Sequence, residues 1–147
     1  MRTKLVKRYW CDFCNRAGLS AGHMRTHEKH CGLNPNRECR VCKMVVGDRD
    51  ADFVTPPFLN LLDLLPDPEP FKRKYDGTQV EYFDESLSDA ANAAIPALRK
   101  AAGNCPACIL AAIRQKGIPA PMVTKFSFKD DMQEIWNSIN LSHSHYE

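Results

Sequence analysis

The chain has 147 residues, of which 44% are hydrophobic and 26% are charged, a composition typical of globular proteins and not of disordered tails. This length suits one ordinary domain or two small ones. No apolar run approaches the roughly 18 residues that a membrane span needs. The start of the chain, MRTKLVKRYW, lacks the apolar segment of a secretory signal. We therefore expect a soluble, intracellular protein without a membrane partner.

The formal net charge of +2 hides an uneven distribution of charge. Residues 1–43 hold ten Lys or Arg against three acidic residues, whereas residues 44–147 hold ten against 15. Nucleic acid is a natural partner for the basic end, because cations that neutralise phosphates release counterions. The alternative is a solvated basic face that keeps the protein soluble or meets an acidic protein surface.

Seven cysteines are present, and six of them form three C-x2-C pairs: Cys11 and Cys14, Cys39 and Cys42, and Cys105 and Cys108. An odd number of cysteines in a reducing compartment argues against a disulfide framework and favours metal binding. Three cysteines and one histidine can fill a first site, and the other four cysteines can fill a second.

The first candidate metal site lies between Cys11 and Cys31. Two residues separate Cys11 from Cys14, twelve more precede His27, and three more precede Cys31. The short first gap lets two cysteines share a tight turn, and the last gap puts His27 and Cys31 one helical turn apart. Because zinc takes four such ligands at tetrahedral corners, the spacing predicts a zinc finger.

This stretch resembles the classical two-Cys two-His zinc finger, with Cys31 standing in place of the second His. Tyr9 matches the aromatic residue that the family has before its first Cys, and Met24 matches the apolar residue before its first His. Gly18 departs from the pattern, since the family usually has an aromatic residue there, and Leu19 lies beside it.

Other ligand sets compete with this one. His23 and His27 also have the separation of a ligand pair, and His30 is adjacent to Cys31. We prefer His27 with Cys31, since only this choice keeps the twelve-residue gap and Met24 in register. Unmetallated thiols beside a solvated His-rich helix are the remaining alternative.

The resemblance implies which finger residues would meet nucleic acid. The base-facing helix positions would be held by Ser20, His23 and Thr26. None of these is the Arg that reads guanine with two hydrogen bonds. Three basic residues are better suited to phosphates: Arg16, Arg25 and Lys29. A single finger buries little surface, so we expect contacts mainly with phosphates, of DNA more than of RNA, without tight sequence specificity.

The finger is expected to be a ββα-like unit. Its period-two pattern around the first cysteine pair predicts a short hairpin. Residues 19–31 predict a helix that Ser20 caps and Gly32 ends.

A second candidate site combines two distant cysteine pairs. Cys39 and Cys42 form a knuckle, and residues 45–47 predict the return strand of a hairpin. Pro106 suits the first position of a helix that Cys105 caps and Gly117 ends. A knuckle on a hairpin with a cysteine pair at a helix start resembles the treble-clef family of zinc sites. The resemblance implies that a second zinc ion is bound by Cys39, Cys42, Cys105 and Cys108.

Two alternatives to this second site remain. His30 or Cys31 could join Cys39 and Cys42 in a local site and leave the distant pair free. Cys105 and Cys108 could instead be a redox pair, since a helix start lowers the pKa of the first thiol. The residues before that pair look helical, unlike the strand of thioredoxin-like folds, which argues against redox chemistry.

The remaining segments are assigned from their apolar patterns. Residues 55–66 predict a short helix whose apolar face would pack on the second site: Phe58, Leu61, Leu62 and Leu65. Residues 79–83 and 122–128 predict strands. Residues 86–102 predict an alanine-rich helix that Pro96 kinks or splits.

A terminal helix is expected over residues 128–141, with Ser127 and Asp130 at its start. Its apolar stripe consists of Phe128, Met132, Ile135, Trp136 and Ile139. This helix either locks the core or docks on another subunit.

No catalytic constellation is found. The chain has no G-x-S-x-G, no Gly-rich phosphate loop and no H-E-x-x-H. Catalytic zinc keeps one coordination position open, whereas both candidate sites can close with four protein ligands. We therefore expect no enzymatic activity and no small-molecule substrate.

The expected fold class is α+β. A basic zinc finger over residues 1–34 precedes a treble-clef-like zinc domain over residues 35–147, with an insertion at 48–103. Structural metals suit such small units, since below roughly 70 residues a core alone seldom gives enough stability. The leading function is a non-enzymatic zinc protein whose finger contacts nucleic acid. The alternative is a structural subunit of a larger protein assembly, with zinc as a cross-link and the terminal helix as the contact.

Residues 8–42 also resemble small bacteriophage proteins. In these a Cys-Cys-His-Cys finger is followed by an Asn-Pro-Asn-Arg linker, here residues 34–37, and a further knuckle. This resemblance implies a viral setting, in the host cytoplasm or in a phage particle, without implying a role.

Overall fold

The computed structural model describes residues 1–46 and 58–143. In chain order the elements are β1 Tyr9–Trp10, β2 Ala17–Gly18, α1 Ala21–His30, α2 Arg40–Val46, α3 Phe58–Asp63, β3 Phe71–Tyr75, β4 Thr78–Tyr82, α4 Glu85–Ala101, α5 Pro106–Lys116, the 3₁₀ helix η1 Ala120–Met122 and α6 Phe128–His143. The strands form two antiparallel pairs, β1 with β2 and β3 with β4. This is a mixed α+β fold, as expected. Within residues 1–46 and 58–143, no helix combines the length and the apolar character that crossing a lipid bilayer requires.

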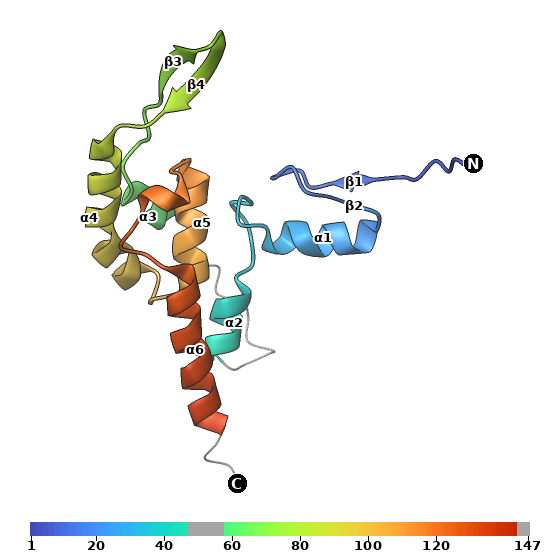
Figure 1. The fold of residues 1–147 in the computed structure, drawn as a ribbon. Coiled ribbons are helices and arrows are strands. Elements are labelled where there is room, and N and C mark those ends of the chain that lie inside the picture. The colour runs from blue at the N-terminus through green and yellow to red at the C-terminus, as the bar shows by residue number, and fades with distance from the viewer. Residues whose placement is uncertain (47–57, 144–147) are drawn as a thin grey trace.

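Figure 1 shows a helical body with three projections. The body consists of α3, α4 and α5, and the β3–β4 hairpin projects from one end of it. An arm made of β1, β2 and α1 extends to one side, and α6 runs away from the body toward the C-terminus. The arm corresponds to the expected finger.

The arm has the predicted ββα order. The backbone N–H of His23 donates to Ser20 Oγ over 3.4 Å, so Ser20 caps α1 as expected. A small core consists of Cys11, Met24 and Cys31, with Tyr9 and Cys14 packed against it. A Cβ atom on Gly18 would lie 3.3 Å from Met24 Cε. The Met24 side chain therefore occupies space beside the glycine that stands in place of the family's aromatic residue.

A larger core joins the helices of the body to the second cysteine cluster. Leu61, Leu98, Ile109 and Ile113 are fully buried in it, together with Cys39 and Cys108, and Cys105 is buried beside them. The predicted apolar helix is α3, and its Leu61 and Leu62 pack in this core as expected, together with Leu65 just after the helix. Residues 55–57 and the Phe58 side chain lie outside the described part of the chain. The alanine-rich helix α4 runs through the exposed Pro96 without being split.

The prediction of a hairpin strand at residues 45–47 is wrong. The segment forms α2 instead, whose first turn is closed by a hydrogen bond of 3.2 Å from the N–H of Lys43 to the carbonyl of Cys39. Gly47 lies outside the described residues. A return strand needs a neighbour to accept its hydrogen bonds, and no strand pairs with this segment among the described residues. The β-branched Val45 and Val46 therefore do not make this segment a strand.

The prediction of a strand at residues 122–128 is also wrong. The segment contains the end of η1 and the start of α6. The carbonyl of Met122 accepts hydrogen bonds from Ser88 Oγ and Asn92 Nδ2 of α4, at 2.6 and 3.3 Å. The N–H of Lys125 donates to Asn92 Oδ1 over 2.9 Å. Side chains of α4 thus satisfy backbone groups that a strand would pair with another strand.

The expected strand at residues 79–83 is β4, displaced by one residue, and its partner β3 was not predicted. Asp76 and Gly77 have φ values of 45° and 82° and join the two strands. Positive φ at both turn residues is the geometry of a tight hairpin turn, for which Asp-Gly is a strong signal. The hairpin was thus visible in the sequence and was missed.

The terminal helix α6 starts as expected. The N–H of Asp130 donates to Ser127 Oγ over 3.4 Å. Arg99 Nη1 and Nη2 donate to the two carboxylate oxygens of Asp131 at 2.7 and 3.3 Å, which ties α6 to α4. On the apolar stripe, Phe128 and Trp136 remain 40% and 47% exposed. The stripe is therefore only partly covered by the described residues.

Candidate metal centres and basic surface

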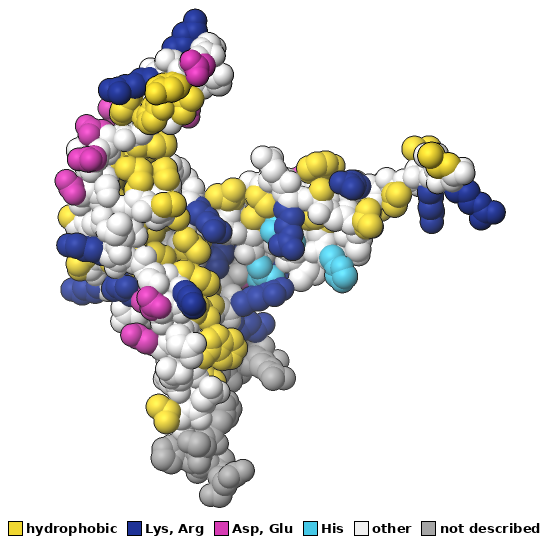
Figure 2. All heavy atoms as spheres, in the orientation of Figure 1, with side chains coloured by type: hydrophobic (Ala, Val, Ile, Leu, Met, Phe, Trp, Pro, Cys, Tyr) yellow, Lys and Arg dark blue, Asp and Glu magenta, His cyan; other side chains and the backbone are white. Residues whose placement is uncertain are grey.

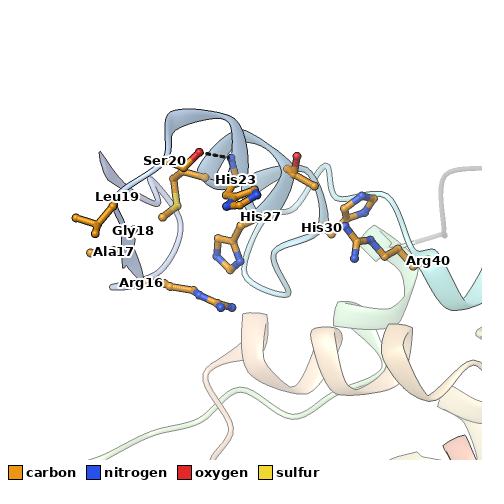
Figure 3. Close-up of a pocket in the computed structure, with 11 residues that line it drawn as sticks. Arg16, Ala17, Gly18, Leu19, Ser20, His23, His27, His30 and Arg40 are labelled. Carbon is orange, nitrogen blue, oxygen red and sulfur yellow. Dashed lines mark hydrogen bonds between the residues drawn. The ribbon is translucent and has the colours of Figure 1, made fainter. Parts of the chain in front are cut away.

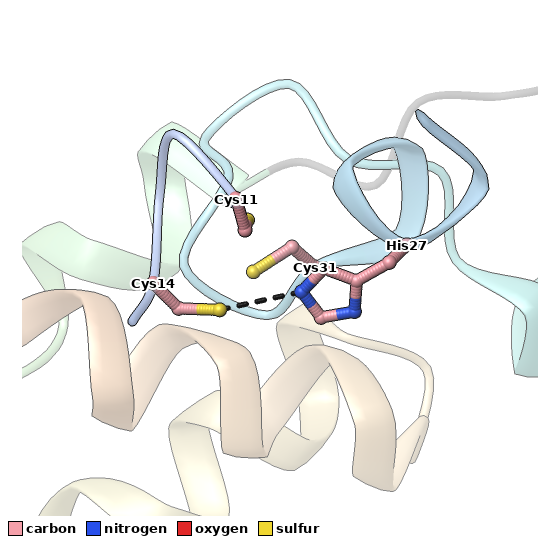
Figure 4. Close-up of side chains that lie close together, drawn as sticks. All are labelled: Cys11, Cys14, His27 and Cys31. Carbon is pink, nitrogen blue, oxygen red and sulfur yellow. Dashed lines mark hydrogen bonds between the residues drawn. The ribbon is translucent and has the colours of Figure 1, made fainter. Parts of the chain in front are cut away.

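The first candidate metal centre brings together Cys11, Cys14, His27 and Cys31. Their potential ligand atoms all lie within 4.8 Å of one another. Figure 4 shows the two cysteines of the hairpin loop facing His27 on α1 and Cys31 just after α1. These are the four residues that the sequence spacing selected.

Local hydrogen bonds shape the loop that carries Cys11 and Cys14. The N–H of Cys11 donates to the carbonyl of Arg16 over 2.9 Å and closes the loop. The N–H of Phe13 points at Cys11 Sγ over 3.5 Å. The N–H of Asp12 donates to Glu28 Oε1 over 3.0 Å and so ties the loop to α1. The loop is therefore held against the helix that supplies the other two ligands.

The ligand geometry fits a tetrahedral ion. Cys14 Sγ and His27 Nε2 lie 3.3 Å apart, close to the roughly 3.6 Å expected when a sulfur and a nitrogen lie about 2.3 and 2.0 Å from one ion. His23, the competing ligand, does not belong to this group. His30 Nδ1 lies 3.0 Å from the carbonyl of Glu38 instead. Both rival histidines are thus outside the cluster.

The second candidate metal centre consists of Cys39, Cys42, Cys105 and Cys108, again with all ligand atoms within 4.8 Å of one another. Two Sγ–Sγ distances across it are 3.6 Å, from Cys39 to Cys105, and 3.5 Å, from Cys42 to Cys108. A disulfide would need about 2.05 Å. Two sulfurs bound to one tetrahedral ion lie about 3.8 Å apart. The four thiols are free and spaced for a shared cation.

Both pairs of the second centre start a helix. Cys39 directly precedes α2, and Cys105 caps α5 with Pro106 as the first residue. Partial positive charge at a helix N-terminus favours thiolates. α5 ends at Gly117, whose φ of 83° requires glycine and fulfils the expectation for this helix. The hairpin expected for the treble-clef resemblance is not present here, because Cys42 lies within the helix α2.

Hydrogen bonds among the four thiols distribute their protons unevenly. Bonding to Cys105 lowers the pKa of Cys39, and bonding to Cys108 lowers the pKa of Cys105. Bonding to Cys105 raises the pKa values of Cys42 and Cys108. Four thiols in one buried space cannot all ionise without a cation. A metal ion would remove this conflict by stabilising all four thiolates.

Four of the six predicted nucleic-acid residues line a hollow of about 470 Å³ on α1: Arg16, Ser20, His23 and Thr26. Figure 3 shows that His30 and Arg40, which were not predicted, lie at the end of α1 opposite to Ser20. Arg25 is exposed and does not line the hollow. Lys29 Nζ lies 2.9 Å from Glu38 Oε1 and lines a neighbouring hollow.

Charge is unevenly spread over the surface. On the face in Figure 2, Lys, Arg and His side chains lie along the arm and its junction with the body, and further Lys and Arg side chains lie over the body and the β3–β4 hairpin. The acidic side chains visible there gather over the body and its two other projections. On this face the arm is therefore the more strongly basic part, whereas the body carries both signs of charge.

Comparison of the chain with protein-family models, with curated proteins and with solved structures gave no match. The functional interpretation therefore depends on the geometry of the two centres and of the surface beside them.

Proposed function

We propose that this protein binds two zinc ions for structural purposes and uses its basic arm to contact nucleic acid, mainly through phosphates. The observation that carries the proposal is the shared hollow beside the first centre, where Arg16, Ser20, His23 and Thr26 converge from the hairpin and α1. A basic concave surface on a metal-braced helix is suited to a polyanion.

The donor sets favour zinc over harder cations. One centre offers three thiols and an imidazole, and the other offers four thiols. Thiolate and imidazole ligands in tetrahedral geometry suit zinc, whereas magnesium and calcium prefer oxygen. When bound, zinc would cross-link the hairpin to α1 and α2 to α5. The protein side chains would then make the contacts with nucleic acid.

The two hydroxyl groups that line the hollow are poorly suited to distinguish one base from another. Thr26 Oγ1 donates to the carbonyl of Gly22 over 3.1 Å, so its proton is already used within α1. Ser20 Oγ accepts the capping hydrogen bond of the same helix. Neither is free to read base edges with a full set of hydrogen bonds. Phosphate contacts through Arg16, Arg25 and Lys29 remain the main source of affinity.

The test is titration of labelled duplex and single-stranded oligonucleotides with the zinc-loaded protein at several salt concentrations. Replacement of Arg16, Arg25 and Lys29 by Ala should weaken binding and lower the duplex salt slope by about 2 to 3, since each lost phosphate contact removes about 0.9. The matched control replaces three exposed cations outside the arm by Ala: Lys100, Arg114 and Lys129. Absence of binding by the wild type at low salt would refute the proposal.

A second candidate function is that of a subunit in a protein assembly, where zinc is a cross-link. The observation that favours it is the partial exposure of Phe128 and Trp136, at 40% and 47%, on the projecting helix α6. Light scattering after size-exclusion chromatography tests self-assembly through this face. An oligomer that Trp136→Ser dissociates would support the candidate, and a wild-type monomer at every concentration would contradict assembly with its own copies.

A further inference from the structure

The hollow on α1 continues beyond the arm. His30 and Arg40 line it, and both also line a second hollow of about 260 Å³ that includes Lys29, Glu38 and Lys43. The two hollows therefore adjoin at His30 and Arg40. We define the basic groove as this continuous surface, marked in order by Arg16, His23, His30, Arg40 and Lys43.

The far end of the basic groove belongs to the second metal centre. Arg40 directly follows Cys39, and Lys43 directly follows Cys42, so each basic residue is adjacent to a cysteine of that centre. Figure 3 shows Arg40 beside His30, and the Arg16 side chain reaching toward His27. The groove thus links residues positioned by one centre to residues positioned by the other.

Short contacts hold the junction between the two halves of the groove. The N–H of Glu38 donates to the carbonyl of Lys29 over 2.8 Å. His30 Nδ1 lies 3.0 Å from the carbonyl of Glu38. Lys29 Nζ and Glu38 Oε1 are 2.9 Å apart, so the acidic side chain at this junction is neutralised by a lysine. Arg40 and Lys43 make no ion pair among the described residues.

The length of the groove suits a polymer of phosphates. His23 and His30 are seven residues apart on α1, which corresponds to roughly 10 Å along the helix. This is about three base-pair steps of 3.4 Å. Arg16 and Arg40 also line the hollow on α1, and Lys43 lines the one that adjoins it, so the cations are spread over more surface than a single small anion would cover.

We propose that a nucleic-acid backbone follows the basic groove from Arg16 of the arm to Arg40 and Lys43 of α2. The second metal centre is then part of the nucleic-acid site, because it positions the distal cations. This inference rests on the proposed function. It adds Arg40 and Lys43 as nucleic-acid contacts, which the resemblance to zinc fingers does not imply. It also implies that nucleic acid contacts both zinc units at once.

The test uses the full zinc-loaded chain and labelled 20-nucleotide probes, duplex and single-stranded. The double variant Arg40→Ala with Lys43→Ala should lower affinity about tenfold at low salt and reduce the duplex salt slope by about 1.8, or about 1.4 for a single strand. Arg40→Lys should retain wild-type binding, since a phosphate needs only the charge. Lys100→Ala with Lys129→Ala removes the same charge outside the groove and should change neither quantity.

The outcomes separate this inference from the proposed function. Weaker binding by the arm variants with unchanged binding by the Arg40 and Lys43 variant would overturn the groove and leave the function standing. No binding by the wild type would overturn both. Native mass spectrometry checks that the double variant keeps two metal ions. If it does not, charge reversal by Lys43→Glu alone replaces it, and unchanged binding by that variant would equally overturn the groove.

Discussion

The guanidinium group of Arg37 donates a hydrogen bond to the backbone carbonyl of Ala107 over 3.0 Å. Arg37 is 5% exposed and lies in the linker after the first metal centre, whereas Ala107 lies between two cysteines of the second. Gln115 Nε2 of α5 adds contacts with the carbonyls of Gly32 and Asn34, at 2.9 and 3.3 Å. The linker is therefore docked on α5, and the two centres are held in a defined relation.

Replacement of Arg37 should destabilise the protein without removing either metal. Arg37→Met keeps most of the apolar volume but leaves the carbonyl of Ala107 without this donor, which should cost about 1 to 3 kcal/mol. Urea unfolding at fixed free zinc measures the free energy of unfolding, since bound metal itself adds stability. The control Arg114→Met alters an exposed arginine of α5 and should stay within about 0.5 kcal/mol. Equal effects of both variants would mean that the Arg37 contact does not contribute.

Metal stoichiometry should follow the two clusters. Native mass spectrometry should find two zinc ions in the wild type and one in either Cys14→Ser or Cys105→Ser, because each serine removes a thiolate from a different centre. His23→Ala and His30→Ala should keep both ions, since neither ring belongs to a cluster. Loss of an ion from either histidine variant would revive a rival ligand set. Two ions retained in Cys105→Ser would show that this cysteine is not a ligand.

Asn92 should be the most sensitive polar residue of α4. It is 8% exposed, and its amide bonds to the carbonyls of Ser88 and Met122 and to the N–H of Lys125. Asn92→Ala should therefore cost about 1 to 3 kcal/mol of unfolding free energy, because buried backbone groups lose a partner. Asn137→Ala is the matched control, since it removes an exposed helix amide that pairs with Gln133. A small change in both variants would argue that the segment after η1 is held in another way.

The ion pair between Arg99 and Asp131 should anchor α6. Asp131→Asn replaces a carboxylate that accepts two hydrogen bonds from a guanidinium, and the loss should be about 1 kcal/mol. Asp130→Asn, one residue earlier and exposed, removes the same charge from the helix start without breaking this pair. Thermal unfolding of the two zinc-loaded variants gives the comparison. Tm values that fall equally would assign the effect to the helix dipole instead of the ion pair.

Features that depend on neighbouring residues were largely predictable from the sequence. The cap at Ser20, the helix of residues 106–116 and its end at Gly117 follow from local backbone preferences. The grouping of His27 with Cys31 follows from the twelve-residue gap after Cys14 and the position of Met24, since His23 and His27 have the same separation. The β3–β4 hairpin belongs with these features, since the Asp76-Gly77 turn is local too, although it was missed.

Features that depend on distant partners were not predictable in the same way. The apolar residues after Cys42 and the alternating residues after Pro121 both looked like strands, yet a strand requires a partner to satisfy its backbone. In the second case Asn92 and Ser88 of α4 provide the hydrogen bonds instead. Only the packing of the helices places these side chains beside the segment.

By itself, the sequence selected the first metal cluster over its rivals, because the spacing puts two ligands on one tight turn and the other two in the last turn of one helix and just after it. The tertiary structure decided the second cluster, where the paired sulfurs are 66 residues apart in the chain. Spacing could not choose between that grouping and a local site with His30 or Cys31. The choice depends on which helix starts meet when the apolar faces of α3, α4 and α5 pack together. Contacts of Lys29 and His30 with Glu38 place Arg40 beside His30, which no local pattern indicated.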